Sequence, residues 1–260
     1  MQTVEQTARR RKSNAEKFLV LMLGGGVILA ALSFLFLRFG AESLSLSDIL
    51  NAFFAFDEGE FKHVIARDIR LPRLLADIIV GVSLAVAGAV MQGNTKNPMA
   101  DSGIMGISAG SVFAIVLMMA FLPDASRLER IGYSCLGALA ATLLIYGVAL
   151  LGHTGRSADR MVLSGMAIST LFSSVSSAVI LKSGNVNAMM KYTAGSSANT
   201  IWLDVGLSAP FFAAGLIAAL VMARSLTIMG LGDEVSRELG ANTRLIRLVG
   251  TIVVLVLSAI

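Results

Sequence analysis

The stretch LGDEVSRELG, residues 231–240, decides how this chain is understood, because it is a short charged segment between two long apolar runs. Leu231, Val235 and Leu239 recur every four residues, which predicts one apolar stripe along a helix of about two turns. A helix this short is marginal by itself in water. Two interpretations of the stretch are therefore open: a helix seated in the groove of a partner protein, or a solvated loop between membrane spans.

The other residues of this stretch are compatible with either interpretation. Asp233 and Arg237 are four residues apart, so on a helix they would form an ion pair, and Glu234 adds a second acid to that polar side. Gly232 and Gly240 bound the segment, as glycines do at turns and helix ends. The residues alone leave helix and loop equally open.

The composition of the whole chain predicts a membrane protein. Of the 260 residues, 55% are hydrophobic and 15% are charged, and the mean hydropathy is +0.77, whereas soluble domains carry about 25% charged residues. The net charge of +4 does not indicate a nucleic-acid surface, because the basic residues lie between apolar runs, as the positive-inside rule describes. Cys135 is the single cysteine, which excludes an intrachain disulfide and predicts a small buried apolar side chain there.

About seven apolar runs are long enough to cross a bilayer, which takes about 20 helical residues. The first follows a basic tail at residues 1–16 and is too long for a cleaved signal peptide, so we expect a retained span. Each run must be helical, because lipid cannot satisfy free backbone N–H and C=O groups. The sequence predicts an all-α, polytopic transmembrane bundle over residues 17–260, with spans at 17–38, 64–93, 103–122, 130–151, 160–181, 203–223 and from about 245 onward.

The distribution of basic residues predicts the orientation of this bundle. With the N-terminal tail in the cytoplasm, most of the 21 Lys and Arg residues fall in inner segments, as the positive-inside rule requires. The segment 231–240 then also lies on the cytoplasmic side. The basic residues assigned to the inside are Arg9, Arg10, Arg11, Lys12, Lys17, Lys96, Arg156, Arg160, Arg224, Arg237, Arg244 and Arg247.

Three short motifs resemble catalytic sequences, and each is better explained by helix packing or by loops. GISAG at 106–110 formally matches the serine motif of hydrolases, but that motif needs a strand and a turn where this sequence predicts apolar helix. Ser164 would need a histidine at the same depth, and the two histidines, His63 and His153, fall on opposite sides. GHTGRS at 152–157 lacks the lysine and the spacing of a phosphate-binding loop. We expect no enzymatic activity, no cofactor and no metal site.

Intramembrane ionisable residues are the usual sign of an ion-coupled carrier, and Asp77 is the main candidate in this chain. Asp77 lies four residues after Arg73, so an ion pair on the helix surface explains it better than a proton relay does. An ion-coupled secondary transporter is therefore kept as the alternative function.

The second apolar run begins RDIRLPRLLAD, with Arg70 and Arg73 at its expected outer end and Pro72 in the first turn of the expected helix. Two interpretations are open here: the arginine stems cover the lipid interface, or the guanidinium groups bind carboxylates of an external protein. At the other end, NTKNPMADSG has the composition of a tight inner turn. Its turn residues are Asn94, Asn97 and Pro98.

Residues 70–110 and 231–248 together resemble the permease subunits of ABC importers for iron–siderophore, haem and vitamin B12 complexes, the FecCD-type transmembrane proteins. The first stretch resembles the family's Arg-x-Pro-Arg helix start and Asn-Pro turn, and the second resembles its cytoplasmic coupling segment. The resemblance implies a non-enzymatic subunit of an importer in the bacterial cytoplasmic membrane. It also implies a homodimer or heterodimer of permeases, two cytoplasmic ATPase subunits and an extracytoplasmic substrate-binding protein.

The resemblance assigns roles to residues of this sequence. Arg70 and Arg73 would receive acidic residues of the binding protein, and the inner turn would gate the path. A coupling helix at about 232–240 would seat in a groove of the ATPase. The residues that the resemblance implies for ATPase coupling are Leu231, Gly232, Asp233, Glu234, Val235, Arg237, Leu239 and Gly240.

The sequence departs from the family in its length. Family members have about ten spans, whereas this sequence ends within the seventh expected span. The resemblance therefore predicts a fragment or a truncated product. A truncated, non-functional permease remnant is for this reason a further alternative to an active importer subunit.

Overall fold

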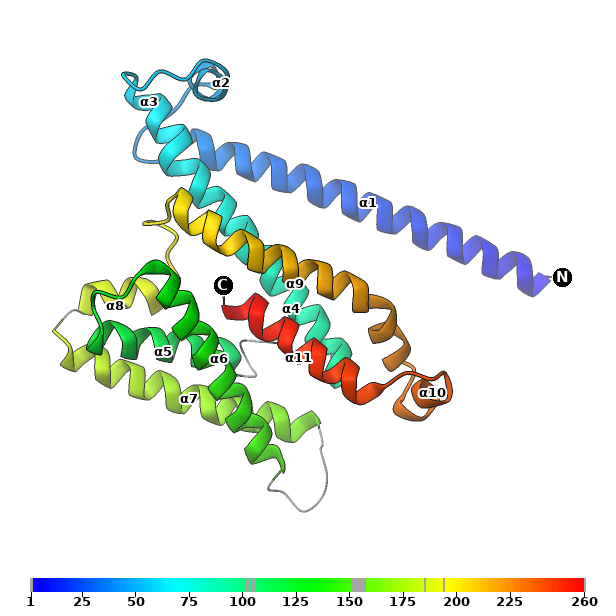
Figure 1. Ribbon diagram of the computed structural model, residues 1–260. Coiled ribbons are helices and arrows are strands. Elements are labelled where there is room, and N and C mark those ends of the chain that lie inside the picture. The colour runs from blue at the N-terminus through cyan, green and yellow to red at the C-terminus, as the bar shows by residue number, and fades with distance from the viewer. Residues whose placement is uncertain are drawn as a thin grey trace. The chain divides into compact units, whose positions relative to one another are not determined.

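A computed structural model of the chain describes residues 2–101, 103, 106–150, 158–184, 186–193 and 195–259. Every regular element among these residues is a helix (Figure 1), which confirms the predicted all-α class. The chain forms two compact units, Met1–Leu74 and Leu75–Ile260, each with buried residues of its own.

The first unit consists of a long apolar helix followed by short helices packed at its end. α1 spans Gln2–Arg38 and contains the first expected span as Glu16–Arg38, so the expected tail at 1–16 belongs to the same helix. α2, Leu46–Phe54, and α3, Phe61–Val64, follow it and pack together. Their core consists of Leu44, Ile49, Ala52, Ile65 and Ala66, with Phe34, Leu37 and Ile69 against it.

The second expected span begins with an irregular helical turn before a proline. A π-helix, η1 at Ile65–Arg70, leads into α4, Leu71–Thr95, and the Leu71 N–H donates to the Ala66 carbonyl five residues earlier. Pro72 is fully buried inside the continuous run from α3 to α4. Pro72 therefore lies in the first turn of α4, as the sequence predicted, although η1 continues the helical run before it. The interior of an α-helix does not tolerate the ring and the missing N–H of a proline. The wider π turn accommodates Pro72 within the continuous helical run.

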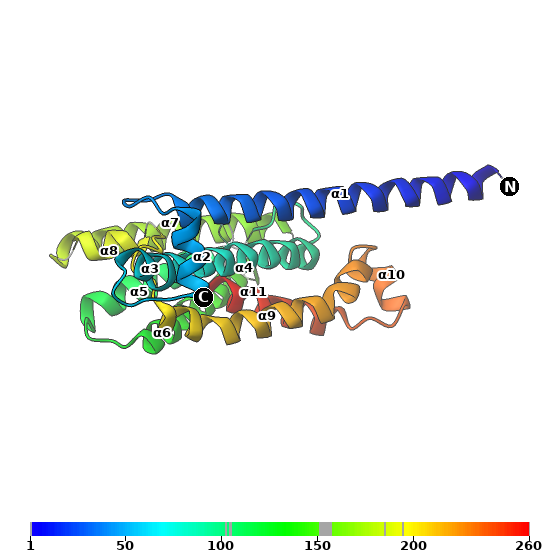
Figure 2. The same ribbon diagram turned by 90° about the horizontal axis from the view of Figure 1, so that it is seen from above.

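The second unit holds the rest of α4 and the later helices of the chain. Their bounds are α5 Ile107–Phe121, α6 Arg127–Leu150, α7 Ala158–Lys182, α8 Val186–Thr193, α9 Trp202–Met229, α10 Asp233–Glu238 and α11 Thr243–Ala259. α5, α6 and α7 pack against one another, and α9 packs against α11 (Figure 1). α10 lies at one end of the α9–α11 pair in both views (Figure 2). An apolar cluster that includes Met91, Ile107, Val254 and Leu257 is buried between these helices.

Five described helical segments are long and apolar enough to cross a membrane. They contain the first, second and sixth expected spans and overlap most of the fourth and fifth. The third expected span is shorter than predicted, because α5 begins at Ile107 rather than at 103 and has 15 residues. Gly106 precedes it with a left-handed φ of +81°, which an α-helix interior does not contain. The seventh expected span is α11, which has 17 residues. The short helices α2 and α8 were not predicted.

Two glycines bring α5 and α6 close together, as the helix-packing explanation of GISAG predicts. A Cβ atom on Gly110 would lie 2.5 Å from the Gly137 carbonyl oxygen, so the two helices approach closely because both positions are glycine. The GISAG motif is thus the start of α5 and a helix contact, and not a nucleophile turn.

Candidate functional site

The segment at 231–240 contains the helix that the sequence left open against a loop. α10 covers Asp233–Glu238. Gly232 before it has a φ of +114°, and Gly240 after it has a φ of +79°. Both values lie in the left-handed region that favours glycine. The two glycines therefore allow the sharp turns by which the chain leaves α9 and enters α11.

A buried hydroxyl group fixes α10 to the helix before it. Ser236 has no exposed surface, and its Oγ lies 2.9 Å from the Ile228 carbonyl of α9 and within hydrogen-bond distance of the Gly232 carbonyl. The Ala241 N–H donates to the Ser236 carbonyl at 2.9 Å. Ser236 was not among the predicted site residues, although a small polar residue beside an apolar stripe is a suitable anchor.

The apolar stripe of this segment faces away from the core. Leu231 and Leu239 are 62% and 61% exposed, and Val235 is also exposed. The described charged residues of the helix are exposed as well: Glu234, Arg237 and Glu238. The side chain of Asp233, and with it the expected ion pair, lies outside what the structure describes. Exposed apolar side chains on an anchored helix are typical of a surface that a partner covers.

The residues of the expected inner turn separate into two groups. Asn94 lies in α4, is 7% exposed, and donates through Nδ2 to the Arg247 carbonyl of α11 at 3.2 Å. Gly250 leaves room for this side chain, since a Cβ there would lie 2.3 Å from Nδ2. Asn97 and Pro98 follow α4 in a turn that Asn97 closes with its own carbonyl and side chain. The Asn94 side chain thus binds α11, whereas Asn97 makes its hydrogen bonds within its own turn.

The Asn94 contact continues across three helices. Thr251 Oγ1 donates to the same Arg247 carbonyl at 2.9 Å, and the Tyr146 hydroxyl of α6 lies 3.1 Å from Thr251 Oγ1. These polar groups join α4, α11 and α6. Because α11 follows α10 after residues 239–242, the exposed stripe and the Asn94 contact belong to one continuous stretch of chain.

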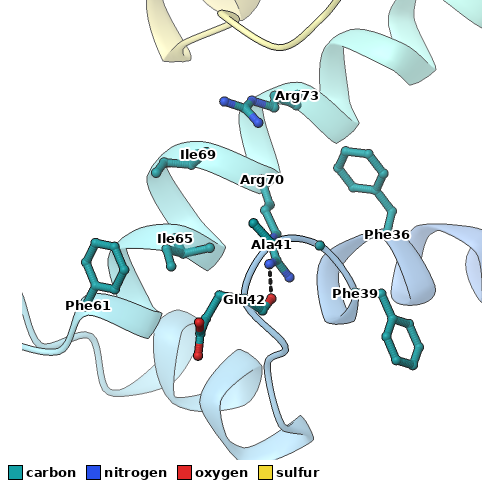
Figure 3. A pocket seen from close by; sticks show the side chains of 10 residues that line it. Phe36, Phe39, Ala41, Glu42, Phe61, Ile65, Ile69, Arg70 and Arg73 are labelled. Carbon is teal, nitrogen blue, oxygen red and sulfur yellow. Dashed lines mark hydrogen bonds between the residues drawn. The ribbon is translucent and has the colours of Figure 1, made fainter.

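Arg70, at the expected docking end of the second span, is buried within its own unit. The residue is 7% exposed and ends η1. Its guanidinium group donates to the Leu37 carbonyl at 2.6 Å and to the Glu42 carbonyl (Figure 3). A Cβ on Gly40 would lie 2.7 Å from Arg70 Nη2, so the connection after α1 passes closely around this group.

Arg73 lies one helical turn further along and has an unused donor. Its side chain is half-buried, and its Nε has no hydrogen-bond partner among the described residues. Arg70 and Arg73 line one pocket of about 470 Å³ together with Phe36, Phe39 and Phe61. Figure 3 shows the two guanidinium groups pointing apart, Arg70 toward the connection after α1 and Arg73 away from it. The two arginines therefore have different surroundings.

The residues considered for a hydrolase or an ion-coupled carrier include the two histidines and Asp77. His63 is buried, and its Nδ1 accepts the Asp57 N–H at 3.2 Å, so this imidazole supports the loop before α3. His153 lies outside the described residues. Asp77, the candidate for ion coupling, is exposed on α4. In the part of the chain that the structure describes, no group of three or more His, Cys, Asp or Glu residues could hold a metal ion.

Comparison with known proteins gives the family of the chain. Residues 28–260 match the FecCD transport family. The chain is 35% identical to the Fe(3+)-citrate import system permease protein YfmD of Bacillus subtilis, over 97% of this chain and 74% of that protein. It is 33% identical to the iron(3+)-hydroxamate import system permease protein FhuB of Bacillus subtilis, over 92% and 62%. It is 34% identical to the ferric enterobactin transport system permease protein FepD of Escherichia coli, over 89% and 68%.

A solved structure has the same fold. An inward-facing metal-chelate-type ABC transporter matches with a TM-score of 0.73 at 22% identity, over 92% of this chain and 74% of that chain. The chain spans 62% of the length of FhuB, which is less than two thirds of that relative. The family match covers most of the described helices, including α4 with Arg73 and the anchored helix α10. This chain belongs to the FecCD transport family.

Proposed function

We propose that this chain is the membrane-spanning permease subunit of an ABC importer that moves an iron–siderophore-type chelate, haem or cobalamin inward across a bacterial cytoplasmic membrane. The names of its relatives support this proposal, because they are permease proteins for iron(3+)-hydroxamate, Fe(3+)-citrate, ferric enterobactin, cobalamin and hemin. The observation that carries it is α10, an anchored helix with three exposed apolar side chains at i, i+4 and i+8 around it.

In this proposal the exposed stripe of α10 seats in a groove of a cytoplasmic ATPase. Exposed Val235 on α10, with exposed Leu231 and Leu239 beside its two ends, gives an apolar surface suited to such a groove. Ser236 binds α10 to α9, and only residues 239–242 separate α10 from α11, so a displacement of α10 reaches both helices. When ATP closes the ATPase pair, the segment moves as a rigid lever and the bundle changes between outward and inward access. The ATPase carries out hydrolysis, and this chain contributes no catalytic residue.

At the expected outer end, we assign Arg73 as the direct contact for an external substrate-binding protein. Its side chain is only half-buried and points away from the connection after α1 (Figure 3), and the terminal N–H groups of such a guanidinium bind a carboxylate well. Arg70 has the same role by resemblance, but its donors already hold Leu37 and Glu42. We therefore propose that Arg70 shapes the docking surface by fixing the connection after α1, and that Arg73 meets the partner.

The proposed assembly contains a second permease, identical or related, with the transport path between the two. Large apolar side chains are exposed on several long helices, for example Leu143 on α6 and Val221 on α9. Lipid or a second permease would cover these faces. The distribution of basic residues in the sequence supports an orientation with the N-terminus and α10 on the cytoplasmic side.

Uptake of chelate into proteoliposomes tests this function. The vesicles contain the chain with a co-purified ATPase, and the external solution contains the binding protein with radioactive iron on a hydroxamate or on citrate, or with haem. We expect uptake that requires ATP and the binding protein, and that continues when ionophores abolish all ion gradients. Uptake that needs no ATP and stops with the ionophores would indicate an ion-coupled carrier and would refute the proposal.

A further inference from the structure

The proposed transport function assigns no role to α2, a short helix of the first unit. Its start is fixed by a capping box, in which the Ser45 hydroxyl accepts the Asp48 N–H at 3.1 Å and the Asp48 carboxylate accepts the Ser45 N–H at 2.9 Å. Lys62 of α3 donates to the same carboxylate at 3.2 Å. These contacts fix the position of α2 and its rotation about its own axis.

The residues of α2 fall into three sectors around the helix, because successive residues are rotated by about 100°. Ile49 and Ala52 form the buried sector in the core of the unit. The polar sector consists of Ser47, Asp48 and Asn51. The third sector is apolar and exposed, with Phe54 at 87% exposure. Its residues are Leu46, Leu50, Phe53 and Phe54. The apolar surface of α2 is thus much wider than the part that the core covers.

The position of α2 beside the end of α1 indicates what covers this third sector. Glu16–Arg38 of α1 is long and apolar enough to cross a membrane, and its most apolar window has no buried residue within the chain. Phe34 and Leu37, near the end of that segment, pack against the same core as Ile49 and Ala52 of α2. α2 is therefore held at the depth where a membrane-spanning helix leaves the hydrocarbon.

Two further aromatic residues of the first unit are exposed. Phe39 and Phe61 are exposed and line the pocket beside Arg73 (Figure 3). Asp48, the charged residue of α2, forms an ion pair with Lys62, so these two charges compensate each other. A helix with one wide apolar face, placed next to a span, has the form of an interfacial helix.

We propose that α2 is an interfacial helix that inserts its exposed sector into the leaflet at the C-terminal end of α1. The partner of this surface is phospholipid, and the side chains enter the boundary between headgroups and acyl chains to a depth of about 5–10 Å. The polar sector faces water and the buried sector holds the rest of the unit. α2 thereby fixes how far Arg70 and Arg73 stand from the membrane surface. This inference does not depend on the transported substrate.

Fluorescence quenching by brominated phospholipid tests the proposal. Trp202 is the only tryptophan, so Trp202→Phe gives a background without signal, into which Phe54→Trp or Asn51→Trp is introduced. The full chain is reconstituted in phosphatidylcholine vesicles with bromine on the acyl chains near the headgroup. Phe54→Trp should lose most of its fluorescence, and the control Asn51→Trp, on the polar sector of the same helix, should keep most of its own. Aqueous iodide should quench the two variants in the opposite order.

Equal quenching of both variants by the lipid would overturn the proposal. It would also be overturned if iodide reached Phe54→Trp freely and only an added binding protein shielded it, because the surface would then belong to a protein contact. If a tryptophan variant does not fold, nitroxide labels on Phe54→Cys and Asn51→Cys in a Cys135→Ser chain give the same comparison. Faster relaxation of the first label by oxygen supports insertion, and faster relaxation by a water-soluble nickel complex contradicts it.

Discussion

The characteristic residues of the two stretches that carry the resemblance to the family differ in their burial. In RLPR, residues 70–73, the first arginine is buried and bound to main-chain carbonyls of its own unit. In residues 231–240, the apolar stripe is exposed and Ser236 does the anchoring. The stretches that carry the resemblance therefore contain both residues bound within the chain and residues left exposed.

The chemistry of the side chains explains this difference. A guanidinium group has five N–H donors, so Arg70 can satisfy two carbonyl oxygens of an irregular connection at once. Leucine and valine gain only by burial, and α10 is too short to bury them by itself. Substitutions at Arg70 should therefore lower the stability of the fold, whereas substitutions in the stripe of α10 should lower partner binding at constant stability.

The largest effect on stability is expected for Arg70→Met. The change removes two hydrogen bonds from a charged group and leaves the Leu37 and Glu42 carbonyls unpaired, which costs about 3 kcal/mol. The matched change Arg73→Met, one turn away, should cost less than about 1 kcal/mol. Thermal unfolding in detergent, followed by circular dichroism, measures both values. Equal losses would break the comparison, because both arginines would then be structural.

A smaller effect is expected where α4 meets α11, and it tests whether Asn94 belongs with the structural residues. Gly250→Ala places a methyl group 2.3 Å from Asn94 Nδ2, and such overpacking costs about 1–3 kcal/mol. Asn94→Ala removes the amide that clashes. The double variant should therefore lose about 1 kcal/mol less free energy of unfolding than the two single variants lose in sum. A double-mutant cycle of unfolding measures this coupling. Strict additivity would mean that the two residues do not touch.

The smallest effect concerns pH and the start of α2. The backbone N–H and the hydroxyl of Ser45 lower the pKa of Asp48 from 3.8 to about 2. A carboxylate whose pKa is lower in the folded protein stabilises the fold above its unfolded pKa, and this is lost as the pH falls from about 4 toward about 2. The thermal midpoint of the wild type should approach that of Asp48→Asn in this interval. If the thermal midpoints of the wild type and Asp48→Asn still differ at about pH 2, the ionised capping box is not the cause of that difference.

Much of the fold could be predicted because its signals lie within contiguous segments. The long helices follow from apolar runs matched to the bilayer. The helix at 231–240 is shorter than its spacing predicted, because Gly232 has a left-handed φ, so that Leu231 precedes α10 and Leu239 follows it. α2 was missed, because nine residues are too few for a span and its apolar residues serve both the core and an exposed sector. The start of α5 was placed too early, because nothing local showed that Gly106 adopts a left-handed φ.

The candidate site could be predicted only in part, because several contacts join distant segments. The acceptors of Arg70 lie 33 and 28 residues before it, so the sequence could not show that its donors are already used. Asn94 and the Arg247 carbonyl are 153 residues apart, and the turn composition around Asn94 pointed instead to Asn97. The anchoring role of Ser236 depends on how α10 folds back on the end of α9, which the spacing of residues does not contain.

The affinity of the chain for its ATPase tests the central claim most directly, namely that the exposed stripe of α10 receives that subunit. The chain is placed in lipid nanodiscs, and binding of the purified ATPase is measured for the wild type, for Val235→Asp and for the apolar control Val235→Leu. A charge in the stripe should weaken binding about 30-fold, which corresponds to about 2 kcal/mol, while the control and the unfolding temperature stay at wild-type values. If Val235→Asp binds the ATPase as tightly as the wild type, α10 is not the coupling helix of this chain.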